Sequence, residues 1–268
     1  MKKIFAVIAL FFAFVSTSAV AKNDYSCDKK FIFFPGGPEG GPFGTIVYNG
    51  AVAAAEHTGC DVDYYWSQWN SEIMIKQFKE AVALQPDGIA IYGFPGDAAM
   101  RPIIQEAREM GIVITTMNTP LPDLESEFKT EGFGYAGADL FDAGFNLGKK
   151  AVDVCGLQAG DKAFIWGLAS MPNRGERTKG AIAGVEAAGV EVVYQEIPDN
   201  VNSDASQGTP MYVATYSANP DIKMAITDHG GLTASLPTYM KAAGHGTEEV
   251  CGAGFDLSAP IVDGINSG

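Results

Sequence analysis

Residues 88–118 read GIAIYGFPGDAAMRPIIQEAREMGIVITTMN. The pattern predicts a short strand at 88–92, a helix at 98–110 and a second strand at 113–117. Gly111 stands between the helix and the second strand, as glycine commonly does where a helix ends. Two strands joined through a helix form a parallel pair, so this stretch predicts an α/β fold built on a parallel sheet.

The same alternation extends in both directions along the chain. Before this stretch, strands are expected at 31–34 and 62–66 and helices at 43–58 and 71–84. After it, strands are expected at 163–166, 191–197, 224–227 and 250–255, and helices at 140–154, 177–188, 210–218 and 233–243. The chain therefore predicts two similar, doubly wound parallel-sheet lobes.

The lobe boundaries follow from a break in this alternation. Residues 119–136 contain two prolines and several acidic side chains, which indicates a hinge or linker. We therefore expect an N-terminal lobe at 22–118, a hinge at 119–136 and a C-terminal lobe at 137–256.

The first 21 residues predict a cleaved export signal. Lys2 and Lys3 precede an apolar run at 4–15, and Ala19 and Ala21 form a small-x-small cleavage pattern. A membrane anchor is the weaker alternative, because the run is shorter than the ~20 residues of a membrane span. No cysteine follows the run closely in a lipoprotein pattern, so we expect a soluble exported protein.

The composition narrows the class of protein. Of the 268 residues, 47% are apolar, which is enough to bury a core and excludes a disordered chain. The net charge of −14 repels phosphate backbones and anionic headgroups. We therefore expect no nucleic acid and no membrane surface among the partners.

The cysteines favour disulfides, which persist in exported proteins. Cys27 precedes the predicted strand at 31–34 and Cys60 precedes the strand at 62–66, so neighbouring parallel strands would bring both to one sheet edge. Of three possible connectivities, the preferred one pairs Cys27 with Cys60 and leaves Cys155 with Cys251. The spacing of cysteines and histidines does not fit a zinc site, and no metal or cofactor is expected.

Ligands of open parallel sheets bind outside the carboxyl ends of the strands. The loops at these ends carry aromatic rings that can stack on a sugar, and planar polar groups that can bind neighbouring hydroxyls. The candidate ligand-binding residues are Phe43, Trp69, Asn118, Arg177, Asp228, His229 and Asp256. Packing for the two aromatic residues and a surface charge for Arg177 are the alternative interpretations.

No catalytic motif accompanies these residues. The glycine-rich loop at 35–42 lacks GxGxxG order and contains three prolines, which cannot donate an amide hydrogen to a phosphate. The chain also lacks HExxH, GxSxG and Cys–His arrangements. We therefore expect a binding protein and not an enzyme, with an exported carbohydrate-active enzyme as the weaker alternative.

Several motifs occur in a specific order: GPFGTIVYNGA at 41–51, QPDGIAIY at 85–92, AREMGIVITTMN at 107–118, ADLFDAG at 138–144, RGERTKG at 174–180 and GFD at 254–256. In this order and spacing, the chain resembles the periplasmic sugar-binding proteins of ABC importers, the type I group that includes ribose- and galactose-binding proteins. The resemblance implies a periplasmic monomer with two lobes joined by a hinge. These lobes would close on a monosaccharide or related polyol and present it to the membrane permease of an ABC importer.

The resemblance also implies individual contacts. Phe43 matches an aromatic residue that stacks on the sugar, and Arg177 matches an arginine that binds its oxygens. Asp256 matches the aspartate of the GFD motif. His229, or Asp228 if the alignment shifts by one residue, falls near an asparagine of the family.

Two positions depart from the family pattern. Asn118 and Thr119 stand where the family often has Asp and Arg, which argues against ribose itself as the ligand. Trp69 is less constant in the family, but its loop faces the cleft.

Two alternatives concern partner and length. The same site would serve a protein that presents its sugar to a chemoreceptor or a sensor kinase. The family continues beyond the GFD region, so residues 257–268 are expected to begin a return to the N-terminal lobe, with several tens of residues missing after them. A naturally shortened protein is the other interpretation.

Overall fold

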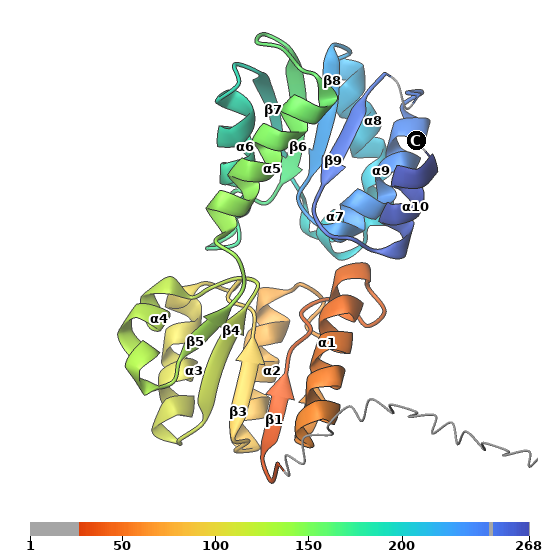
Figure 1. Cartoon of the computed structure of the whole chain (residues 1–268). Coiled ribbons are helices and arrows are strands. Elements are labelled where there is room, and N and C mark those ends of the chain that lie inside the picture. The colour runs from red at the N-terminus through yellow and green to blue at the C-terminus, as the bar shows by residue number, and fades with distance from the viewer. Residues whose placement is uncertain (1–26, 247–248, 268) are drawn as a thin grey trace, which may run out of the picture.

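The computed structural model describes residues 27–246 and 249–267, and the predicted export signal at 1–21 lies outside them. These residues form two α/β lobes, one above the other in Figure 1. Each lobe contains one parallel sheet, which confirms the predicted fold class. Within the described residues, no helix is long and apolar enough to cross a membrane.

The N-terminal lobe is built on a five-stranded sheet of order β2-β1-β3-β4-β5. Its elements are β1 (Lys30–Phe33), α1 (Pro42–Thr58), β2 (Asp61–Tyr64), α2 (Ser71–Ala83), β3 (Gly88–Ile91), α3 (Asp97–Glu109), β4 (Val113–Met117), α4 (Pro122–Phe128), η1 (Lys129–Glu131) and β5 (Gly134–Ala136).

The C-terminal lobe is built on a four-stranded sheet of order β7-β6-β8-β9. Its elements are α5 (Leu140–Cys155), β6 (Lys162–Gly167), α6 (Glu176–Glu186), β7 (Glu191–Glu196), α7 (Asp199–Ser203), η2 (Ala205–Gly208), α8 (Thr209–Ala218), β8 (Ile222–Thr227), α9 (Gly230–Ala242), β9 (Cys251–Gly254) and α10 (Ala259–Ser267).

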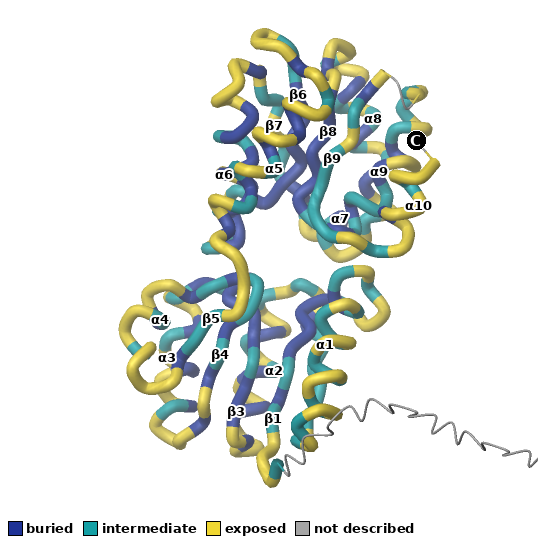
Figure 2. The backbone as a smooth tube through the Cα atoms, viewed as in Figure 1, coloured by how far each residue is buried: buried dark blue, intermediate teal, exposed yellow. Residues whose placement is uncertain are grey.

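The central strand β6 shows why the predicted strands are so apolar. Its side chains alternate between two cores, with Phe164 and Trp166 in one and Ala163 and Ile165 in the other. All four are at most 1% exposed, since helices cover both faces of the sheet. Figure 2 shows the same pattern, with buried strands inside and exposed helix surfaces outside.

Residues 119–136 fold as part of the N-terminal lobe, not as the linker expected from the sequence. Pro122 lies in the first turn of α4, where proline starts a helix because its missing N–H is not needed. Strand β5 then pairs with β4 in the same sheet. The connection between the lobes is therefore the short segment 137–139, seen between β5 and α5 in Figure 1.

Residues 257–267 also differ from expectation. Instead of beginning a return to the N-terminal lobe, residues 259–267 form α10, which lies against α9 of the C-terminal lobe.

Two disulfides are present, between Cys27 and Cys60 and between Cys155 and Cys251. The first joins the segments that precede β1 and β2, the pairing favoured from the sequence. The second ties the end of α5 to the start of β9.

The carboxyl ends of the strands in both sheets point toward the space between the lobes (Figure 1). In the first sheet the chain winds in opposite directions from β1 and β3, and in the second sheet from β6 and β8. Loops diverge at such a switch point and leave a crevice for a ligand. Two switch points thus face one another across the lobe boundary.

Candidate functional site

A cavity of about 330 Å³ lies between the lobes, lined by loops at the carboxyl ends of both sheets. Six of the seven residues selected from the sequence line it: Phe43, Trp69, Asn118, Arg177, His229 and Asp256. The seventh, Asp228, lies buried behind this surface. The residues selected because they follow strand ends therefore lie close together in the fold, although they are far apart in the sequence.

Aromatic rings form the N-terminal wall of the cavity. The centroid of Trp69 lies 6.0 Å from that of Phe43, 5.6 Å from Tyr92 and 6.3 Å from Phe94. Trp69 packs against the glycine-rich loop, where a Cβ on Gly37 would lie 2.6 Å from the indole ring. Glycine at this position of the loop therefore makes room for the Trp69 ring.

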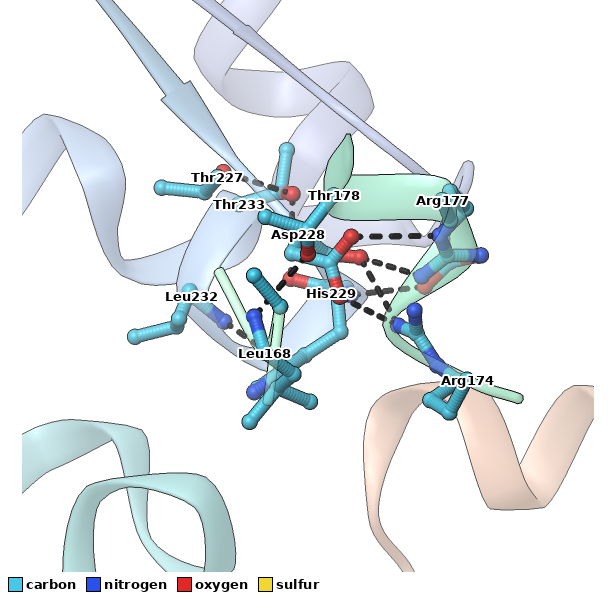
Figure 3. Close-up of polar contacts among 12 residues, drawn as sticks. Leu168, Arg174, Arg177, Thr178, Thr227, Asp228, His229, Leu232 and Thr233 are labelled. Carbon is cyan, nitrogen blue, oxygen red and sulfur yellow. Dashed lines mark hydrogen bonds and ion pairs between the residues drawn. The ribbon is translucent and has the colours of Figure 1, made fainter. Parts of the chain in front are cut away.

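A buried ion-pair cluster forms the opposite wall, and Figure 3 shows it in close-up. Arg174 Nη2 lies 2.5 Å from Asp228 Oδ2, and Arg177 Nε donates to Asp228 Oδ1 at 3.3 Å. Both guanidinium groups also donate to the backbone carbonyl of Asp228. The three side chains are only 8%, 8% and 2% exposed, so Asp228 acts as the shared counter-ion that orients both arginines.

The charges of this cluster are shifted by burial and by one another. Burial and the neighbouring Arg174 lower the pKa of Arg177 to about 10, so Arg177 stays protonated at neutral pH. Burial alone would raise the pKa of Asp228, but the two guanidinium groups outweigh it and hold that pKa below its ordinary value. The cluster thus contains two cations and one anion.

His229 joins this wall through the start of α9. Its Nδ1 accepts a hydrogen bond of 3.5 Å from the backbone N–H of Leu232, which caps the helix. Burial lowers the pKa of His229 to about 4, so the ring is neutral at neutral pH. With Nδ1 accepting, the ring proton is assigned to Nε2.

Three cavity residues adopt the left-handed backbone conformation: Trp69 (φ 55°), Asn118 (φ 57°) and Asp256 (φ 73°). Such backbones are uncommon outside glycine and cluster at binding sites. Asp256 is held by its Oδ2, which accepts a hydrogen bond of 2.6 Å from Gly230 N. Burial raises the pKa of its carboxyl group.

Four buried polar atoms of cavity-lining residues lack a hydrogen-bond partner among the residues that the structure describes. They are Tyr92 Oη and Thr119 Oγ1 in the N-terminal lobe, and Arg174 Nη1 and His229 Nε2 in the C-terminal lobe. A buried polar group without a partner costs about 1–3 kcal/mol. Because these atoms belong to the walls of one cavity, a polar ligand in that cavity would be their natural partner.

Sequence reasoning missed part of this site. Tyr92, Phe94 and Arg174 were not selected, although Tyr92 and Phe94 closely follow the end of β3 and Arg174 lies in the loop between β6 and α6. Thr119 was noted only as a departure from the family pattern. The described residues hold no group of three or more His, Cys, Asp or Glu side chains suited to a metal ion.

The chain matches a family model over residues 32–268, and that model describes a periplasmic binding protein domain. No curated protein matches the sequence.

Solved structures show the same fold at low sequence identity. A glucose-galactose binding protein from Geobacillus stearothermophilus is 21% identical, with a TM-score of 0.75 over 90% of this chain and 82% of its own. A carbohydrate transporter from Acidothermus cellulolyticus, in complex with myo-inositol, is 21% identical, with a TM-score of 0.71 over 90% and 78%. An ABC transporter solute binding protein from Burkholderia graminis, in complex with D-arabinose, is 20% identical, with a TM-score of 0.77 over 91% and 81%.

Proposed function

The chain belongs to the periplasmic binding protein family, and from this premise we propose that it captures a monosaccharide or related polyol between its lobes and delivers it to an ABC importer. The observation that carries the proposal is the set of four unpartnered polar atoms contributed by both walls of one cavity. The family consists of binding proteins rather than enzymes, and capture without turnover is the activity proposed for this chain.

The two walls suit the two kinds of surface that a sugar offers. The rings of Phe43 and Trp69 provide an apolar face for its C–H groups. Asn118, Arg177, His229 and Asp256 supply amide, guanidinium, imidazole and carboxylate groups for its oxygens. Asp228 is proposed to act indirectly, by orienting Arg177. Similar structures bound to myo-inositol and D-arabinose support this class of ligand.

Capture follows from contacts made on both sides of the ligand. A ligand that binds only one lobe stabilises open and closed forms equally, whereas contacts from both lobes form only on closure. Ligand binding therefore shifts the population toward the closed form, which is the form proposed to dock on the permease.

A periplasmic location and a monomeric state complete the proposal. The two disulfides support an oxidising compartment. Presentation of the ligand to a chemoreceptor is a second use of the same closed form, and only a partner assay separates it from transport.

The test uses variants that remove an unpartnered hydroxyl at nearly constant shape. Tyr92→Phe and Thr119→Val should stabilise the ligand-free protein, because each removes a buried group that has no partner. The same variants should weaken sugar binding about fivefold, the value of about 1 kcal/mol for one hydrogen bond. Opposite signs for stability and affinity distinguish a binding group from a structural one.

Calorimetry and thermal shift with pentoses, hexoses, polyols and cyclitols provide the readout, and recovery of unchanged ligand tests for turnover. Tyr212→Phe is the matched control, since Tyr212 is buried in the C-terminal core and does not line the cavity. Its affinity should equal that of the unmodified protein. Failure of every such compound to bind the folded protein would refute the proposed function.

A further inference from the structure

The guanidinium group of Arg177 is held by its counter-ion along one edge. Arg177 Nε donates to Asp228 Oδ1 at 3.3 Å, and Arg177 Nη2 donates to the backbone carbonyl of Asp228. The other carboxylate oxygen of Asp228 faces Arg174, whose Nη2 lies 2.5 Å from it (Figure 3). Arg177 therefore lacks the paired bonds to both carboxylate oxygens that fix an arginine most firmly.

An aromatic ring lies against the face of the same guanidinium group. The Cζ atom of Arg177 is 4.0 Å from the ring centroid of Phe255. A cation over a ring face is attracted by the electrons of the ring, and the attraction is strongest where water is excluded. The Arg177 side chain is only 8% exposed, so this contact is largely desolvated. The bonds to Asp228 fix one edge of a planar group, and the ring prevents that group from tilting about the edge.

Phe255 lies next to the cavity without belonging to its wall. It directly follows β9 and precedes Asp256, which lines the cavity, whereas Arg177 stands in the first turn of α6. The backbone beside Phe255 is anchored, because Asp256 Oδ2 accepts a hydrogen bond of 2.6 Å from Gly230 N. Among the described residues that line the cavity, Phe255 is absent. Its ring therefore acts on a ligand through Arg177.

Resting on the function proposed above, we propose that Phe255 is a positioning residue for ligand binding, whose ring holds the guanidinium plane of Arg177 in place at the cavity wall. The electron density on the ring face, and not only the bulk of the ring, then contributes to ligand affinity. A purely structural role for Phe255 depends on size and shape alone. The two roles differ in what they predict for a ring of the same shape that has fewer electrons on its face.

Phenylalanine analogues with one, two or three ring fluorines at position 255 separate these roles, because fluorine withdraws electrons from the ring face and changes its shape little. Isothermal titration calorimetry measures the affinity of each protein for D-glucose, D-arabinose and myo-inositol. Affinity should fall stepwise with each added fluorine. Phe255→Leu, which removes the ring, should end the series with a loss of roughly 30-fold. Phe255→Tyr keeps the ring face and should bind within about twofold of the unmodified protein.

The N-terminal lobe contains a matched control. The Cζ atom of Arg108 in α3 lies 3.7 Å from the ring centroid of Phe128 in α4, and neither residue lines the cavity. Phe128→Leu and the same fluorinated analogues at position 128 weaken an equivalent contact away from the site, so ligand affinity should not change. Where Phe255→Leu does not fold, the fluorinated series decides by itself, because it keeps the shape of the ring.

The outcomes distinguish this role from the proposed function. Ligand affinities that stay equal along the fluorinated series at position 255, or that fall equally along the series at position 128, overturn the positioning role and leave sugar capture intact. If the unmodified protein binds no sugar or polyol, the proposed function fails. Nuclear magnetic resonance of the ligand-free proteins then still tests the contact, because the order parameter of the Arg177 Nε–H bond should fall along the series at position 255. Unchanged order parameters would show that Phe255 does not position Arg177.

Discussion

Asn173 of the C-terminal lobe donates a hydrogen bond of 3.0 Å from Nδ2 to Oδ2 of Asp97 in the N-terminal lobe. The same nitrogen lies 3.0 Å from the carbonyl oxygen of Pro120. The carboxylate of Asp97 is fixed in turn, because its Oδ1 accepts from the backbone N–H of Leu124 in α4 at 3.0 Å. Asn173 precedes Arg174 directly, so this contact joins the lobes beside the cavity.

Removing this contact should favour an open arrangement of the lobes. Asn173 has a φ of 53°, so Asn173→Gly keeps the backbone conformation and removes only the amide. Loss of two hydrogen bonds of about 1 kcal/mol each shifts the ratio of closed to open forms by roughly 30-fold. Small-angle scattering should show a larger radius of gyration for the ligand-free variant, and its ligand affinity should fall.

Asn173→Asp should open the lobes further at neutral pH, because it places a second carboxylate against Asp97. Asn200→Ala is the control, since the Asn200 amide bonds to Gln207 inside one lobe. Scattering profiles and affinities that do not change in either Asn173 variant would show that the contact has no role in closure.

A methyl group on Gly37 should disturb ligand binding through Trp69. Gly37→Ala places a Cβ 2.6 Å from the indole ring, so the ring must move away from the cavity wall. We expect an affinity loss of at least tenfold, with both lobes still folded by circular dichroism. Gly50→Ala is the matched control, because nothing lies within 4 Å of that Cβ on α1 and alanine favours a helix by about 0.5–1 kcal/mol. Equal affinities for the two variants would contradict the role of Trp69.

Neutralising Asp228 should cost far more stability than neutralising an exposed aspartate. Asp228→Asn leaves Arg174 and Arg177 buried without a counter-ion, which typically destabilises by about 3–5 kcal/mol. Asp153→Asn breaks a pair whose side chains are 71% exposed and should have no measurable effect. Urea denaturation of both variants provides the comparison. A similar midpoint for the two would show that the cluster does not depend on its shared anion.

His229 should make the protein less stable as the pH falls from about 6.5 to about 4. Below its ordinary pKa of 6.5 the unfolded chain binds a proton at this residue, whereas the native protein does so only near a pKa of about 4. The unfolded state is therefore favoured progressively across this window, by about 3 kcal/mol in total, and the effect is constant below it.

His229→Asn tests this linkage, because asparagine can still cap α9 and does not titrate. The difference in unfolding free energy between the unmodified protein and this variant should change by about 3 kcal/mol between pH 7 and pH 4. Parallel pH profiles would contradict a buried neutral histidine. The carboxyl groups titrate in both proteins, so their contributions to the unfolding free energy cancel in the difference.

The second disulfide should contribute more stability than the first. Cys155 and Cys251 are 96 residues apart, and Cys27 and Cys60 are 33 apart. Loop-closure entropy then gives about 5 kcal/mol for the longer loop and about 4 kcal/mol for the shorter one. In thermal unfolding, the double Cys→Ala variant that lacks Cys155 and Cys251 should therefore have the lower melting temperature. The reverse order would show that the disulfides do not stabilise the protein mainly by restricting the unfolded chain.

The sequence predicted most of the fold because its apolar runs and helical stretches, and the glycines that end several helices, coincide with the observed strands and helices. It failed at 119–136 because proline both ends and begins helices, and only the tertiary position of Pro122 in α4 decides between these roles.

The site divides in the same way. Strand ends located the loops, since topology alone brings them together. Burial behind the cavity wall could not be foreseen, so the sequence did not separate Asp228, which contacts the two arginines, from residues that line the cavity. Nor did it distinguish Arg174 from ordinary loop residues, because its role depends on which nitrogen atoms Asp228 leaves without a partner.

The left-handed backbones of Asn118 and Asp256 also limit how this protein can evolve toward other ligands. Glycine, asparagine and aspartate accept such a backbone with little strain, so most side chains are closed to these two positions. His229 has an extended backbone, with a φ of −149°, and accepts a wider choice. Substitutions that change ligand specificity should therefore accumulate at His229 and at other cavity residues with ordinary backbone conformations. Positions 118 and 256 should vary only among glycine, asparagine and aspartate.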